Sequence, residues 1–252
     1  MRVVAHLSDL HFGRVERAAL EPLRRRVIEL KPDLVVISGD LTQRARARQF
    51  REARAFLDSL PAPQIVVPGN HDVPLYNVLA RFLRPLAGYR RAIGPDLEPS
   101  YVDDEIAVLG INTARSLVFK GGRVSDAQLA RVEEKLCRLR EEVVKILVTH
   151  HPFMALERLA RCGVDVFVAG HLHTAGIGDA AHRVAGMSAL LVQAGTATSS
   201  RTREEPNSFN LLRISRRRVE VRQYALRRGS FVPAALDTFQ RGQGGWMRCE
   251  PG

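Results

Sequence analysis

The chain of 252 residues is 45% hydrophobic and 26% charged, which is close to globular averages and excludes a disordered chain or a low-complexity fibre. No apolar run approaches the roughly 20 residues that a membrane helix needs, and the first residues lack a signal-peptide core, so we expect a cytoplasmic protein without an integral membrane segment. The net charge of +11 would attract phosphate-bearing partners, nucleic acid among them, but it is equally expected of a solvated arginine-rich surface.

Short, mainly apolar runs alternate along the chain with helical patterns. The runs are too short for helices and are typical of strands buried on both faces: Val3–Leu7, Leu34–Ile37, Ile65–Val67, Ile146–Val148 and Val164–Val168. Helical spacing of apolar residues predicts one helix over Gln43–Leu60 and another after Ser125, where Ser125 and Gln128 form a candidate capping box. Strand and helix in alternation predict an α/β fold.

The later part of the chain has a different pattern. Between residues 183 and 224, strand-like runs follow one another without long helical patterns, which predicts antiparallel pairing and a second sheet packed on the first. No linker or internal repeat divides the chain. We therefore expect one domain over residues 1–225, followed by a C-terminal appendage over 226–252 that is extended or mobile.

Polar residues able to do chemistry follow the predicted strands. They form five clusters, which hold six of the eight histidines: Asp9-x-His11, Gly39-Asp40, Gly69-Asn70-His71-Asp72, His150-His151-Pro152 and Gly170-His171-x-His173. Any one of them alone is more often a turn or a helix cap than a ligand site. Five at successive strand ends predict a common site, since imidazole, carboxylate and amide groups bind divalent metals.

The number and spacing of these donors favour two metal ions. Residues i and i+2 of an extended strand face the same side, so Asp9 can act with His11, and His171 with His173. Glycine before a donor permits a close backbone approach. The seven candidate ligands exceed what one ion with an open position takes, and they fit two ions bridged by a carboxylate: Asp9, His11, Asp40, Asn70, His150, His171 and His173.

The ordered set D-x-H, GD, GNHD, H and GHxH resembles the calcineurin-like metallophosphoesterases, and S-D-L-H-F-G with GHLH resembles their class III cyclic-nucleotide phosphodiesterase branch. The resemblance implies a four-layer αββα sandwich of two mixed sheets flanked by helices. It also implies two divalent metal ions of the manganese, iron, zinc or cobalt type, bridged by Asp40. One would be held with Asp9, His11 and His173, and the other with Asn70, His150 and His171. The family pattern favours His150 over His151.

The same resemblance implies hydrolysis of a phosphodiester by a metal-bridging hydroxide, with His71 as general acid or phosphate-binding cation. Asp72 is interpreted either as the partner of the His71 ring or as the cap of a helix near Pro74. A small diester such as a 3',5'-cyclic nucleotide is the expected substrate. A nuclease or phosphomonoesterase is the alternative within the family, and a non-catalytic scaffold of this fold is the alternative outside catalysis.

Overall fold

The computed structural model describes residues 1–61, 63–116, 122–151, 163–171, 176–179, 189–200 and 205–249. Within these ranges the strands form a seven-stranded sheet, in the order β13-β12-β11-β10-β1-β2-β3, and a six-stranded sheet, in the order β4-β5-β6-β7-β9-β8. None of the helices in these ranges has an apolar stretch of the length that crossing a bilayer requires.

The seven-stranded sheet is mixed. Its strands β1, β2 and β3 are parallel, whereas β10 to β13 are antiparallel additions beside β1. Their bounds are β1 (Arg2–Leu7), β2 (Leu34–Ser38), β3 (Gln64–Val67), β10 (Ser208–Ser215), β11 (Arg218–Arg227), β12 (Ser230–Gly242) and β13 (Gly245–Arg248). The antiparallel pairing expected of the later part of the chain is confirmed for β10 and β11, but these strands extend the sheet of β1 to β3 instead of forming a second one. The run Leu190–Gln193 belongs to the other sheet, where it pairs parallel with one neighbour and antiparallel with the other.

The six-stranded sheet is also mixed. Strands β5, β6, β7 and β9 are parallel, and β4 and β8 pair antiparallel at its two edges. Their bounds are β4 (Ser100–Val102), β5 (Ile106–Gly110), β6 (Val144–Val148), β7 (Val166–Ala169), β8 (Gly176–Asp179) and β9 (Leu190–Gln193).

Two of the helices show how local sequence sets the helix ends. The other helical elements are α1 (Arg17–Glu29), η1 (Asn70–Asp72), α3 (Val78–Leu83) and α4 (Ala87–Ala92). Helix α5 (Asp126–Cys137) begins at the predicted capping box, in which Ser125 Oγ accepts the Gln128 N–H and Gln128 Oε1 accepts the Ser125 N–H. Helix α2 (Ala47–Asp58) begins later than residue 43 because Ala45 has a positive φ and Gln49 Oε1 accepts the N–H groups before the helix.

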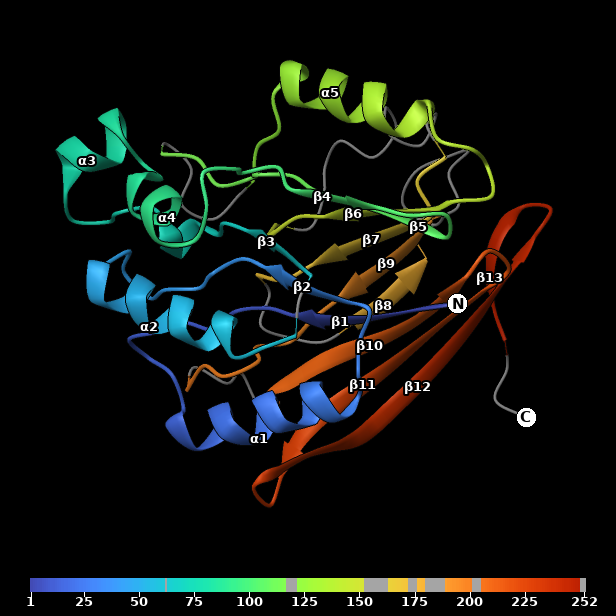
Figure 1. Ribbon diagram of the computed structural model, residues 1–252, viewed down its shortest axis with the longest axis horizontal. Coiled ribbons are helices and arrows are strands. Elements are labelled where there is room, and N and C mark those ends of the chain that lie inside the picture. Colours follow the sequence, from blue (N-terminus) through green and yellow to red (C-terminus); the bar gives the residue numbers. More distant parts are fainter. Residues whose placement is uncertain are drawn as a thin grey trace.

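Figure 1 shows the resulting layers: α5 lies above the six-stranded sheet, and α1 lies below the seven-stranded sheet. Alternation along each strand explains the arrangement, since residues i and i+2 share a face. In β2, Val35 and Ile37 pack on the helices, while Leu34 and Val36 join the core between the sheets. The fold is the predicted αββα sandwich of two mixed sheets.

The segment after residue 226 is extended and paired. Strands β12 and β13 continue the seven-stranded sheet outward from β11, and the pairing places Phe239 and Trp246 in the core between the sheets. Ten residues of β11 pair with this segment. Because backbone pairing and two buried aromatic side chains hold it, residues 230–248 form the edge of the sheet.

Candidate metal centre

The predicted ligands meet at one edge of the molecule because the parallel strands of both sheets end there. Asp9 follows β1, Asp40 follows β2, and Asn70 follows β3 in the first sheet. His150 follows β6 and His171 follows β7 in the second sheet. Figure 1 shows these parallel strands running in the same direction. The seventh predicted ligand, His173, lies outside the described residues.

Asp40 lies at the centre of this group. Its Oδ2 is 3.4 Å from His150 Nε2 and 3.7 Å from His11 Nε2. Its carboxylate belongs to two clusters of three donor atoms, each spanning no more than 4.8 Å: one with Asp9 and His150, the other with His11 and His71. A carboxylate shared by two clusters is the arrangement that a bridging ligand requires.

The remaining described ligands surround the same point. His150 Nε2 is 3.0 Å from Asn70 Oδ1 and 3.3 Å from His171 Nδ1. Asp9 Oδ1 is 3.4 Å from His11 Nε2. All six described candidates therefore lie within one connected set of close contacts: Asp9, His11, Asp40, Asn70, His150 and His171.

The residues present fit a cation. Asp40 Oδ2 is buried and accepts no hydrogen bond from the described part of the chain, although two imidazole nitrogens face it. A buried carboxylate oxygen without a donor is costly unless a cation replaces water. Two ligands that share an ion at roughly 2.1 Å are separated by about 3–3.5 Å. The donor separations around Asp40 therefore match a shared coordination sphere.

A hydrogen bond next to the ligands connects the two sheets. His150 Nδ1 lies 2.8 Å from the carbonyl oxygen of Ser38, at the end of β2. An N–H donated to that carbonyl leaves Nε2 as the nitrogen that faces Asp40. Gly39 permits this contact, because its φ is +93° and a Cβ atom on it would lie 2.6 Å from His150 Nδ1.

Backbone strain is concentrated at the ligands. Among the described residues other than glycine, seven have positive φ, and four of these are candidate ligands: Asp9, His11, Asp40 and His171. The left-handed region is unfavourable for residues with a Cβ atom and is found mostly where the surrounding structure imposes it. The loops are therefore held in conformations that aim these side chains at one point.

The electrostatics follow from this crowding. Burial alone would raise the pKa of the Asp40 carboxyl, but the neighbouring imidazoles, above all that of His150, hold it well below its ordinary value. Burial opposes the charge on His150 too, yet Asp40 outweighs it and raises the pKa of His150 to about 9. Without a metal, protonated imidazoles thus supply the positive charge that the buried carboxylates require.

His71 lies at the mouth of this centre. Its ring centroid is 5.0 Å from that of His11, and its backbone N–H donates to Asp40 Oδ1 at 2.8 Å. Its Nδ1 is 3.0 Å from the carbonyl oxygen of Gln43, an acceptor that the motif does not contain. That contact orients the ring with Nε2 as the other available nitrogen.

The structure gives Asp72 a different role from both interpretations of the sequence. Its carboxylate accepts the backbone N–H groups of Leu41, Thr42 and Gly69 and the Thr42 hydroxyl, at 2.9–3.1 Å. The His71 ring is not among the partners of this carboxylate, and the next helix, α3, is capped by Asn77 instead. Asp72 therefore joins the loop after β2 to the loop after β3, where Asp40 and Asn70 lie. Burial raises the pKa of Asp72 to about 6.

His151 differs from His150 in its surroundings. Its Nδ1 is 2.8 Å from the Thr113 hydroxyl, and burial lowers its pKa to about 3. Its ring packs on His171, with centroids 4.5 Å apart, but the contacts to Asp40 and Asn70 belong to His150. The geometry thus favours His150 as the ligand of this pair.

Three supporting residues were not predicted from the sequence. The Ser8 hydroxyl donates to Asp9 Oδ2 at 2.6 Å, and the Thr196 hydroxyl donates to the Asp9 carbonyl at 2.8 Å. The third is Gln43, which orients His71. The motif S-D-L-H-F-G contains Ser8 but does not reveal its role, and no motif marks Thr196 or Gln43, whose contacts depend on segments that are distant in the sequence.

Comparison with known proteins identifies relatives of the chain. The model of the calcineurin-like phosphoesterase family matches residues 2–175. The glycerophosphodiester phosphodiesterase GpdQ of Enterobacter lignolyticus is 28% identical over 170 residues, covering 61% of this chain and 58% of that protein. The 3',5'-cyclic adenosine monophosphate phosphodiesterase CpdA of Escherichia coli K12 is 30% identical over 145 residues, covering 55% of this chain and 46% of that protein. The chain thus aligns with about half the length of these curated relatives.

Among solved structures, the purple acid phosphatase PPD1 of yellow lupin superposes with a TM-score of 0.72 and 12% identity, covering 96% of this chain and 54% of that one. At this identity the likeness concerns the fold. The family match covers more than half of the chain and includes every strand that carries a described candidate ligand. The chain belongs to the calcineurin-like phosphoesterase family.

Proposed function

We propose that the chain is a phosphodiesterase that uses two divalent metal ions. The observation that carries the proposal is the position of Asp40, whose carboxylate is common to two of the three clusters of donor atoms among the described residues. One ion would be held by Asp40 with Asp9, His11 and His173. The other would be held by Asp40 with Asn70, His150 and His171. Mixed imidazole, carboxylate and amide donors suit manganese, iron, zinc or cobalt.

The chemistry divides between the ions and the chain. When bound, two such ions would neutralise the phosphate charge and make hydroxide available near neutral pH. His71 would then bind or protonate the leaving-group oxygen, because Gln43 orients its ring at the mouth of the centre. Asp72 would fix the positions of Asp40 and Asn70 relative to each other, because its carboxylate accepts backbone N–H groups from both of their loops.

The substrate class follows from the relatives. GpdQ and CpdA are named for the hydrolysis of phosphodiesters, one a glycerophosphodiester and the other cyclic AMP. We therefore propose a small phosphodiester as substrate, with 3',5'-cyclic nucleotides as the first candidates. A non-catalytic scaffold does not need the six described ligands to be in contact, so their preserved geometry favours catalysis.

The test measures metal content and turnover together. Full-length chain purified with manganese is expected to hold two metal ions and to hydrolyse bis(p-nitrophenyl) phosphate and cyclic AMP. Asp40→Asn should abolish both turnover and binding of the second metal ion, because an uncharged amide at this position cannot bridge two cations. Asp58→Asn is the matched control, since Asp58 is an exposed carboxylate in α2. Intact substrates with two ions bound, or unchanged turnover in Asp40→Asn, would refute the proposal.

A further inference from the structure

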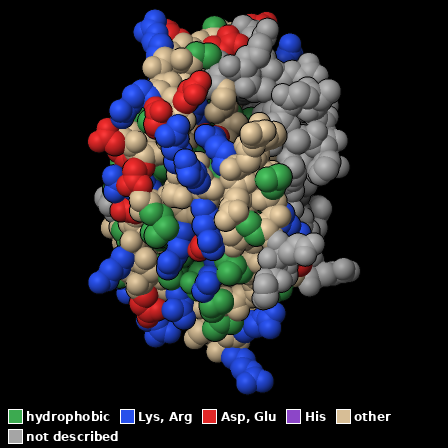
Figure 2. Space-filling view, turned by 90° about the vertical axis from the view of Figure 1, so that its right-hand side faces the viewer, with side chains coloured by type: hydrophobic (Ala, Val, Ile, Leu, Met, Phe, Trp, Pro, Cys, Tyr) green, Lys and Arg blue, Asp and Glu red, His purple; other side chains and the backbone are tan. Residues whose placement is uncertain are grey.

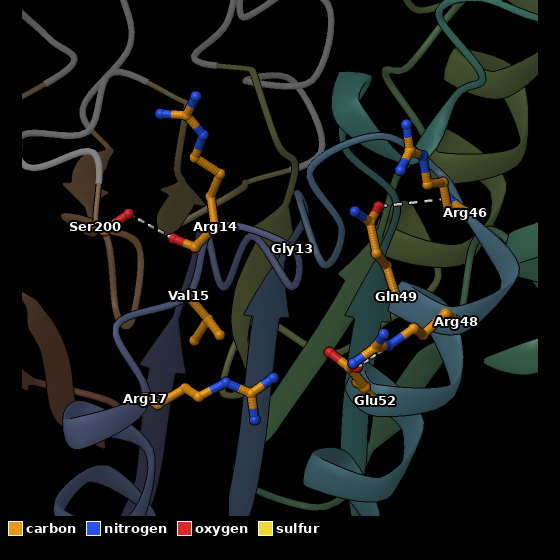
Figure 3. Close-up of a pocket in the computed structure, with 9 residues that line it drawn as sticks. All are labelled: Gly13, Arg14, Val15, Arg17, Arg46, Arg48, Gln49, Glu52 and Ser200. Atoms are coloured by element: carbon orange, nitrogen blue, oxygen red, sulfur yellow. Dashed lines mark hydrogen bonds and ion pairs between the residues drawn. The ribbon is translucent and has the colours of Figure 1, made fainter.

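A cavity of about 370 Å³ lies beside the loop that carries His11. Figure 3 shows its lining: Arg14 and Arg17 come from one side, at the end of the β1 loop and the start of α1, and Arg46 and Arg48 come from the other, at the start of α2. Four arginines thus contribute to the lining of one cavity.

The positive charge of this cavity is only partly neutralised. Glu52 is the one acidic residue in the lining, and it pairs with Arg48 at 2.8 Å. The side chains of Arg14, Arg17 and Arg46 make no ion pair with any residue that the structure describes. Three arginines at one cavity without an acidic partner among the described residues favour a bound anion.

The opposite end of the molecule provides a comparison. Figure 2 shows that end, where both Lys and Arg and Asp and Glu side chains are exposed. Arginines there are paired: Arg2 with Asp103 at 2.9 Å, and Arg241 and Arg248 with Asp165 and Asp237. These three arginines at that end have acidic partners, whereas, within the described residues, three of the four arginines at the cavity have none.

The cavity lies next to the metal centre along the loop after β1, although none of the candidate ligands is in its lining. Gly13 lines the cavity and lies two residues after His11, so their Cα atoms are at most about 7 Å apart. Gly13 packs so closely on Gln49 that a Cβ atom would lie 2.0 Å from Gln49 Nε2. Gln43 connects the loop beside the cavity to the metal centre: its backbone N–H donates to the Phe12 carbonyl, and its own carbonyl contacts the His71 ring.

Guanidinium groups bind phosphate through paired, charge-assisted hydrogen bonds. We propose that this cavity binds a second phosphate of the substrate, one nucleotide away from the diester that is cleaved. A linear dinucleotide that carries a terminal phosphate should then be a better substrate than the same dinucleotide without it, whereas a 3',5'-cyclic nucleotide would occupy the metal centre alone. This inference rests on the proposed phosphodiesterase function and deepens it.

The experiment compares dinucleotides that differ only in a terminal phosphate. The manganese-loaded full chain is given TpT, 5'-phosphorylated pTpT and 3'-phosphorylated TpTp, and kcat/KM is measured for each. One phosphorylated form should exceed TpT by about tenfold, equivalent to about 1.4 kcal/mol. The preference should fall steeply in 1 M salt, where the screening length is about 3 Å. Equal values for all three dinucleotides would overturn the proposal.

Variants locate the effect. Arg14→Ala combined with Arg46→Ala should remove the preference while leaving hydrolysis of bis(p-nitrophenyl) phosphate unchanged. Arg51→Ala combined with Arg91→Ala is the matched control, because both arginines are exposed and neither lines the cavity. A preference that survives the first pair, or that disappears in the second, contradicts the assignment. If the first pair lowers the melting temperature, the single variant Arg14→Gln repeats the measurement.

A binding measurement separates this inference from the proposed function. If no phosphoester is hydrolysed, the proposed function fails, and titration calorimetry of the full chain in EDTA with pTpT, TpTp and TpT then judges the cavity alone. Tighter binding of a phosphorylated form, lost in the Arg14 and Arg46 variant, supports the cavity. Equal binding of all three overturns it.

Discussion

At Gly69, the addition of one methyl group should disrupt the metal centre while the fold is retained. Its φ lies outside the left-handed region, so alanine there is not excluded by backbone conformation. A Cβ atom would, however, lie 2.1 Å from Asp40 Oδ1 and 2.3 Å from the Asp40 backbone nitrogen. An ordinary contact needs about 3.5 Å, so Asp40 must move by roughly 1 Å or more.

That displacement predicts the size of the effect. A misplacement of about 1 Å in a catalytic group costs on the order of 10²-fold in rate, whereas overpacking costs about 1–3 kcal/mol of stability. We expect Gly69→Ala to lose at least about 100-fold in kcat on bis(p-nitrophenyl) phosphate. Its melting temperature should fall by no more than roughly 12 °C, at about 2–4 °C per kcal/mol.

The matched control is Gly94→Ala. Gly94 has no heavy atom within 4 Å of an added Cβ, and its φ is also outside the left-handed region. This variant should keep full activity and two metal ions per chain, as measured by atomic emission. Wild-type turnover and metal content in Gly69→Ala would refute the reasoning. Should that variant fail to fold, Gly170→Ala tests the same idea, because its Cβ would meet the Ser8 hydroxyl and Asp9 Oδ2.

Four further outcomes are expected. His71→Gln should lower kcat by about 10²–10⁴-fold with metal content unchanged, measured by steady-state kinetics and metal analysis. Asp72→Asn should lose about 1–3 kcal/mol in urea denaturation, because its amide NH₂ would face backbone N–H donors. Removal of metal with EDTA should lower the melting temperature, because metal binding stabilises the folded chain by about 2.7 kcal/mol when the free metal concentration is 100 times Kd. Burial lowers the pKa of His6 to about 3, below the value of about 6.5 in the unfolded chain. The contribution of the neutral His6 ring to the free energy of unfolding is therefore complete at neutral pH and is lost as pH falls from about 6.5 towards 3. When the pH is lowered from 6.5 to 4.5, the free energy of unfolding measured in urea should therefore fall less for His6→Gln than for the wild type. An equal fall in both proteins would contradict this.

The sequence predicts the metal centre better than it predicts the groups that support it. The ligands belong to short motifs directly after apolar strands, and the carboxyl ends of parallel strands meet at one edge of a sheet. Their convergence therefore follows from local pattern and topology together. Gln43 and Asp72 could not be assigned in this way, because the roles of both depend on hydrogen bonds between loops that are 28–31 residues apart.

The edges of the fold show a similar limit. Strand β12 contains Pro233 and a run of exposed residues, so period-two alternation is weak there and the sequence predicts only an extended or mobile appendage. Helix α3 is as hard to predict, since most of its apolar side chains are exposed. In both segments the structure is set by pairing or by loop contacts, and such partners are not visible in local periodicity.

The positions of the strained residues explain why the ligands and the fold depend on each other. Asp9 and Asp40 adopt positive φ at the ends of neighbouring strands, and the Asp9 N–H is held by the carbonyl of Gly39 at 3.1 Å. The backbone therefore bears the strain, while the seven-stranded sheet and the Asp72 hydrogen bonds oppose its release. A bound cation would add the attraction that buried carboxylates otherwise take from protonated imidazoles. Loop geometry, sheet pairing and metal affinity are thus contributions to one equilibrium, and a change in any of them should alter the other two.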